Sequence, residues 1–141
     1  MTLDYSKKGQ VSIDMTKYVD TICNMFPQEY IQDAIKFTSP WNDNLFKVNK
    51  KSKLLSNKMK EQFHTTTAQG LFLCKRARPD ISPAIAYLTT RVNNPTEDDW
   101  SKLVRMIKYL KQTSKDILTL KADDLANLHW HVNSLCSASQ L

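Results

Sequence analysis

The feature that most constrains this chain is a sharp break between two helical patterns within residues 62–91. Apolar residues recur at spacings of three and four up to Cys74, and a second helical pattern opens at Ser82. Between them, three cations crowd into residues 75–78, directly before Pro79. The helix dipole favours cations in the last turn, and proline has no N–H with which to continue a helix. The sequence therefore predicts two helices that meet at a basic corner.

The corner itself consists of Arg78, Pro79 and Asp80. Opposite charges on either side of a proline can satisfy each other locally. One interpretation is therefore an ion pair between Arg78 and Asp80 that fixes the turn. The alternative is that Arg78 contacts a substrate directly.

The helix before the corner contains an apparent weak point. It begins at Ser56 or Asn57 and carries Gly70 where an apolar side chain is expected. Glycine in a helix interior costs roughly 1 kcal/mol relative to alanine, and a missing buried side chain costs about 2 to 5 kcal/mol more. The sequence predicts a stability loss at this position.

The last helix of the chain has the strongest pattern. Thr96 and Asp99 form a capping box, and an apolar stripe extends to Leu110. Its cations lie away from that stripe and are Lys102, Arg105, Lys108 and Lys111. They are either a solvated face that complements the helix dipole or an exposed basic edge that follows a nucleic-acid backbone.

Residues 1–57 predict a β-hairpin, a helix and a loop. Apolar residues alternate on both sides of Gly9, and residues 15–26 have helical spacing. Within that helix, residues 18–21 (YVDT) are similar to a polymerase motif that has two adjacent metal-binding aspartates. Thr21 stands here in place of the second aspartate, and we therefore interpret the run as an ordinary helix face. The loop carries lysines that are either solvated or in contact with phosphates: Lys47, Lys50, Lys51, Lys53 and Lys58.

Two further strands are predicted at residues 117–121 and 128–132. The second strand places His129 and His131 on one face, with Cys136 five residues beyond His131. Zinc would require a fourth ligand from His64, Cys74 or water. Without a paired metal-binding knuckle we interpret these as strand residues and predict no metal site.

The fold class expected from these elements is α+β, with strands at both ends and three to four helices between them.

A charge of +6 favours an anionic partner. The cysteines, Cys23, Cys74 and Cys136, are odd in number and lack a CxxC spacing, which indicates reduced thiols in an intracellular protein, with cytoplasm and nucleus both open. No apolar run approaches the roughly 20 residues that span a bilayer, and we expect no membrane partner.

Two segments carry a resemblance to a known family. Residues 78–81 read Arg-Pro-Asp-Ile, and residues 100–113 contain Trp100, Arg105, Tyr109-Leu110-Lys111 and Thr113. In this order they resemble the C-terminal part of the reverse transcriptase region in copia-type LTR retrotransposon polyproteins, which reads TRPDI and then HW....R.LRYLKGT. The match spans most of residues 1–133.

The resemblance implies three segments. Residues 1–55 are a hairpin, helix and lysine-rich connection, residues 56–114 are a helical thumb and connection, and residues 115–141 are the truncated start of an RNase H-like domain. The family combines RNA-directed DNA polymerase and RNase H activities that use Mg²⁺. Asn133 stands where the first RNase H aspartate is expected, and an amide cannot replace a carboxylate at Mg²⁺. This chain is therefore expected to have no catalytic residues, no cofactor and no enzymatic activity.

The resemblance also implies a basic scaffold that contacts an RNA/DNA hybrid or duplex through its phosphates. Its expected residues are Lys75, Arg76, Arg78, Lys102, Arg105, Lys108 and Lys111. The palm and the rest of RNase H would be the other partners. Two alternatives stay open: a stand-alone nucleic-acid-binding module, and a fragment that does not fold without those partners.

Overall fold

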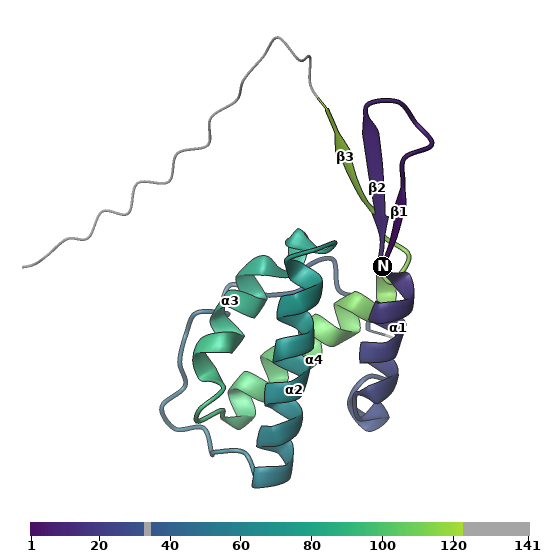
Figure 1. Cartoon of the computed structure of the whole chain (residues 1–141). Coiled ribbons are helices and arrows are strands. Elements are labelled where there is room, and N and C mark those ends of the chain that lie inside the picture. The colour runs from purple at the N-terminus through teal and green to yellow at the C-terminus, as the bar shows by residue number, and fades with distance from the viewer. Residues whose placement is uncertain (33–34, 123–141) are drawn as a thin grey trace, which may run out of the picture.

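Three strands and four α-helices make up the computed structural model, which describes residues 1–32 and 35–122 (Figure 1). In chain order the elements are β1 (Thr2–Asp4), β2 (Gln10–Asp14), α1 (Thr16–Met25), the 3-10 helix η1 (Gln28–Tyr30), α2 (Asn57–Cys74), the 3-10 helix η2 (Pro79–Ile81), α3 (Ser82–Arg91), α4 (Glu97–Gln112) and β3 (Leu118–Lys121). The expected α+β class is confirmed.

The sheet joins the two ends of the described chain in the order β1-β2-β3. β1 and β2 form the predicted hairpin, in which Gly9 has a φ of 71° that favours glycine. β3 pairs antiparallel with β2, and the Ala122 N–H donates to the Gly9 carbonyl at 2.8 Å. The strand expected at residues 117–121 is therefore present, but it adds to the N-terminal hairpin and does not begin a separate sheet. The expected domain boundary at residue 115 would divide β3 from its partner strand β2. The hairpin tip points away from the helices (Figure 1).

Helix α1 forms where residues 15–26 predict it, with Val19, Ile22 and Cys23 buried. Asp20 lies on its exposed side. The YVDT run is therefore part of a helix, as its spacing predicts, and not of the hairpin turn on which the polymerase motif presents two carboxylates.

Gly70 lies in α2 at a close contact with α3. A methyl group at this position would lie 2.5 Å from Cδ1 of Ile85 and 3.5 Å from Cε of Met106. Ile85 and Met106 are themselves buried. The prediction that a missing side chain at Gly70 lowers stability is therefore wrong, because the Ile85 side chain already fills the space beside Gly70. Only the helix-propensity cost of glycine applies.

The start of α4 confirms the capping box. The Thr96 hydroxyl accepts a hydrogen bond from the Asp99 N–H, and the Asp99 carboxylate accepts one from the Thr96 N–H. The preceding loop satisfies two further N–H groups, because Glu97 donates to the Lys53 carbonyl and Asp98 to the Ser52 hydroxyl. The four N–H groups without an intrahelical acceptor, those of residues 96–99, therefore all have acceptors, and the Trp100 N–H donates to the Thr96 carbonyl as the first bond of the helix.

The core lies between the four helices, and α4 contributes the largest share of fully buried side chains to it. From α4 these are Leu103, Met106, Ile107 and Leu110. The sheet is covered much less, since β1 is exposed and β2 is half-buried along its length. None of the helices in the described part of the chain is both long and apolar enough to cross a membrane.

The connection between α1 and α2 runs along α4 and does not extend freely into solvent. The Gln112 side chain accepts from the Phe37 N–H at 2.9 Å and donates to the Ile35 carbonyl at 2.6 Å. Near the other end of α4, Leu54 forms a β-bridge with Thr96. The described part of the loop therefore covers one side of α4, which decides what the cations of this helix can reach.

Candidate nucleic-acid interface

The corner between α2 and α3 is held by four side chains, which we call the corner cluster: Arg78, Asp80, Tyr109 and Thr113. Arg78 donates to Asp80 through Nε and Nη2, with the shortest distance at 2.7 Å. It also donates to the Thr113 carbonyl at 2.9 Å and to the Thr113 hydroxyl at 2.6 Å. The Tyr109 hydroxyl donates to Asp80 at 3.0 Å. The predicted ion pair is present, and it ties the corner to the end of α4.

The charges of the corner cluster stabilise each other. Burial alone would lower the pKa of Arg78, but the hydrogen bond and charge of Asp80 raise it. Burial would also raise the pKa of Asp80, but Arg78 lowers it below its ordinary value, with help from the Tyr109 hydroxyl. Because Arg78 is only 3% exposed, its guanidinium has no free surface for a phosphate. Arg78 therefore belongs to the structure of the corner.

Three of the predicted cations lie exposed on the helix ends that the corner cluster joins. Lys75 and Arg76 follow the end of α2, and Lys111 is in the last turn of α4. The Arg76 guanidinium lies 3.7 Å above the ring of Phe72 and donates to the Phe72 carbonyl. That ring contacts Tyr18 of α1, with 5.3 Å between the ring centroids. The cations are thus carried on packed elements.

The other cations of α4 do not form an exposed edge. Lys102 is 10% exposed and donates to Asp98 at 2.8 Å and to the Lys47 carbonyl at 2.7 Å. Lys108 is 9% exposed. Arg105 is half-buried, and its guanidinium lies 4.3 Å from the ring centroid of Phe37. Both interpretations of these cations, the solvated face and the basic edge along a nucleic-acid backbone, are therefore wrong for Lys102, Arg105 and Lys108, and Lys111 alone of the four is exposed.

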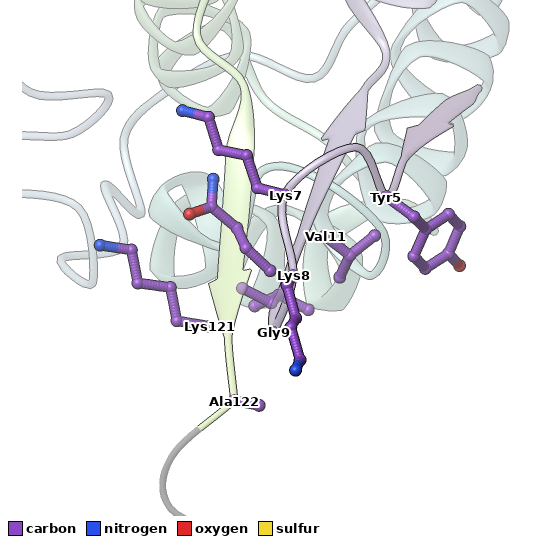
Figure 2. A pocket seen from close by; sticks show the side chains of 9 residues that line it. Tyr5, Lys7, Lys8, Gly9, Val11, Lys121 and Ala122 are labelled. Carbon is purple, nitrogen blue, oxygen red and sulfur yellow. The ribbon is translucent and has the colours of Figure 1, made fainter.

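A second group of cations surrounds the hairpin tip. Lys7, Lys8 and Lys121 line a hollow of about 370 Å³ together with Tyr5. Figure 2 shows Lys7 and Lys121 extending to the same side of β3, with Tyr5 on the other side of the hairpin and Lys8 beyond Gly9. The pairing of β3 with β2 brings Lys121 to this tip. Like charges gathered at one surface favour an anionic ligand.

Sequence reasoning missed these hairpin residues for one reason. Residues 117–121 are expected from the sequence to begin a different sheet, and so Lys121 is not expected near Lys7 and Lys8. The two adjacent lysines before Gly9 were the sequence signal that could have indicated a basic hairpin tip. The lysines predicted to lie in the loop are all exposed, which leaves their two interpretations open, although Lys58 belongs to the first turn of α2: Lys47, Lys50, Lys51, Lys53 and Lys58.

The remaining expectations concern metal ions and lost catalytic groups. Among residues 1–32 and 35–122, no group of three or more His, Cys, Asp and Glu side chains is arranged to hold a metal ion. Cys74 is buried and His64 is exposed. The predicted strand at residues 128–132, its two histidines, Asn133 and Cys136 lie outside the described residues.

Comparison with known proteins gives no relative from which to transfer a function. No protein-family model, no curated protein and no solved structure matches this chain.

Proposed function

We propose that this chain is a non-catalytic part of a copia-type retrotransposon reverse transcriptase and RNase H polyprotein, and that it binds nucleic acid through phosphate contacts. The corner cluster carries the proposal. Arg78 and Asp80 come from the first motif segment, and Tyr109 and Thr113 come from the second, and Arg78 and Thr113 are 35 positions apart in the sequence. A shared hydrogen-bonded cluster gives a physical reason for the two motifs to occur in one chain, and so supports the resemblance.

The binding surface we propose consists of exposed cations on ordered elements. Lys75, Arg76 and Lys111 lie on the joined helix ends, and the hairpin tip adds Lys7, Lys8 and Lys121. Cations of this kind bind phosphates by releasing condensed counterions, without reading bases. The chain would therefore hold a duplex without sequence preference.

The proposal includes neither polymerase nor nuclease activity. Two-metal chemistry requires several carboxylates around the ions, whereas Asp20 is followed by Thr21 on a helix and Asn133 replaces the expected aspartate. Polymerase or RNase H turnover by the purified chain of 141 residues would contradict this part. In the genome, an adjoining palm-coding region with paired aspartates would support the family, and an unrelated coding region would count against it.

Fluorescence anisotropy with a labelled RNA:DNA hybrid tests the binding. We expect association at about 50 mM salt that weakens strongly at about 200 mM, since each phosphate contact adds to the salt dependence. Undetectable affinity at the lower concentration, or affinity that does not change with salt, would reject the proposed function.

A further inference from the structure

Among the residues that the structure describes, Arg105 has no hydrogen-bond acceptor, and it lies beside a cleft along α4. Each of the other arginines donates a hydrogen bond: Arg76 to a carbonyl, Arg78 to Asp80 and Arg91 to Asp99. Within the described residues, Arg105 makes no hydrogen bond or ion pair, and its Nε atom is buried. Buried donors in folded proteins nearly always have a partner, so Arg105 is unusual, and the rest of its guanidinium is the group to consider for binding a ligand.

The cleft has the lining of a small-ligand site. It measures about 310 Å³ and lies between α4 and the loop. Phe37 and Trp41 provide aromatic surfaces, and Asn42, Asn44 and Ser101 provide polar groups near the Arg105 side chain. Aromatic surfaces with a few hydrogen-bonding groups and one cation suit a ligand that combines a flat ring with an anionic group.

The charged residues that line the cleft, two cations and one acid, favour an anion in it. Asp98 also lines the cleft, but Lys102 neutralises it at 2.8 Å. A second hollow that Arg105 lines contains Glu29 together with Lys108, so charge alone does not distinguish that hollow from the cleft. Trp41, Asn42 and Asn44 line the cleft but not the second hollow, and these aromatic and polar groups favour the cleft as the ligand site of Arg105.

We propose that this cleft, the Arg105 cleft, binds a mononucleotide-sized phosphate ester. The Arg105 guanidinium donates to the phosphate oxygens, a geometry that its planar fork matches, while the base lies against Trp41. Phe37 already lies against the guanidinium and holds it in place. None of the six exposed cations proposed to contact a duplex lines the cleft, so the proposal does not depend on duplex binding.

NMR titration of the full isotope-labelled chain with adenosine monophosphate, adenosine and inorganic phosphate tests this site. We expect adenosine monophosphate to shift the Trp41 indole and Arg105 Nε–H signals with a dissociation constant below about 1 mM. Adenosine and phosphate should each bind more weakly. Arg105→Gln should weaken binding of the nucleotide about tenfold or more, whereas Lys17→Gln, which removes an exposed charge on α1, should not change it.

Several results would overturn the Arg105 cleft. These are no shift with adenosine monophosphate, equal binding of adenosine, or unchanged affinity in folded Arg105→Gln protein. If that variant does not fold, Arg105→Lys keeps the charge without the fork and should also weaken binding. Oligonucleotides with and without a 5′-phosphate distinguish a strand end from a free nucleotide. If the protein binds the RNA:DNA hybrid in a salt-dependent way but does not bind adenosine monophosphate, the proposal for the Arg105 cleft is rejected and the proposed function is not.

Discussion

Arg78 donates hydrogen bonds to both the carbonyl and the hydroxyl of Thr113, at 2.9 and 2.6 Å, and so joins the end of α2 to the end of α4. The same guanidinium forms an ion pair with Asp80, so one buried side chain binds both the carboxylate of the corner and the end of α4. This contact explains why a short basic turn can position two helix ends.

Replacing Arg78 by alanine should destabilise the protein. The change leaves the Asp80 carboxylate without its charged partner and the Thr113 carbonyl with the Asp116 N–H as its remaining donor, which we expect to lower the free energy of unfolding by about 2 to 3 kcal/mol. Urea denaturation measures this. Lys75→Ala, an exposed neighbour, is the control and should change stability by less than about 0.5 kcal/mol. Equal stability of the Arg78→Ala and wild-type proteins would contradict the role of the corner cluster.

The corner cluster should also make stability depend on pH. Because the pKa of Asp80 is lowered in the folded protein, its contribution is fully present above the ordinary value of 3.8 and is lost as the pH falls through the lower folded value. Wild-type protein should therefore lose more stability between about pH 5 and pH 2 than Asp80→Asn does. Parallel pH profiles for the two proteins would show that Asp80 is not the group responsible.

Gly70 and Ile85 should be energetically coupled. Gly70→Ala improves helix propensity but forces Cδ1 of Ile85 to move, and we expect a net loss of about 1 kcal/mol. Ile85→Val removes that carbon and costs about 1 kcal/mol alone. The double variant should lose less than the sum of the two, which a double-mutant cycle in urea measures. Simple additivity would mean that the two residues do not compete for the same space.

The thiol of Cys23 should resist modification in the folded state. Burial raises its pKa to about 11, and Asp20 adds to the effect, so the thiolate is scarce near pH 8. We expect slow alkylation by iodoacetamide in native protein and fast alkylation in urea, followed by mass spectrometry of the Cys23 peptide. Rapid labelling without denaturant would contradict the packing of α1 against the core.

Local patterns predicted the elements better than they predicted the long-range contacts. The hairpin around Gly9, the capping box of Thr96 and Asp99, and the Arg78 to Asp80 pair all depend on residues close in sequence. The pairing of Val11 with Leu120 does not, and no periodicity connects strands so far apart. Site predictions failed for the same reason, since nothing in the sequence shows that the segment around Phe37 folds over α4. Gly70 was misjudged because its neighbour Ile85 comes from another helix.

The most direct test of nucleic-acid binding is the salt slope of RNA:DNA hybrid affinity for wild-type protein and for the triple variant Lys75→Gln, Arg76→Gln, Lys111→Gln. Each lost phosphate contact should reduce the slope of log affinity against log salt by somewhat less than about 1, so the account predicts a reduction of about 2 to 3 in the triple variant. A folded triple variant with the wild-type affinity and slope would contradict it.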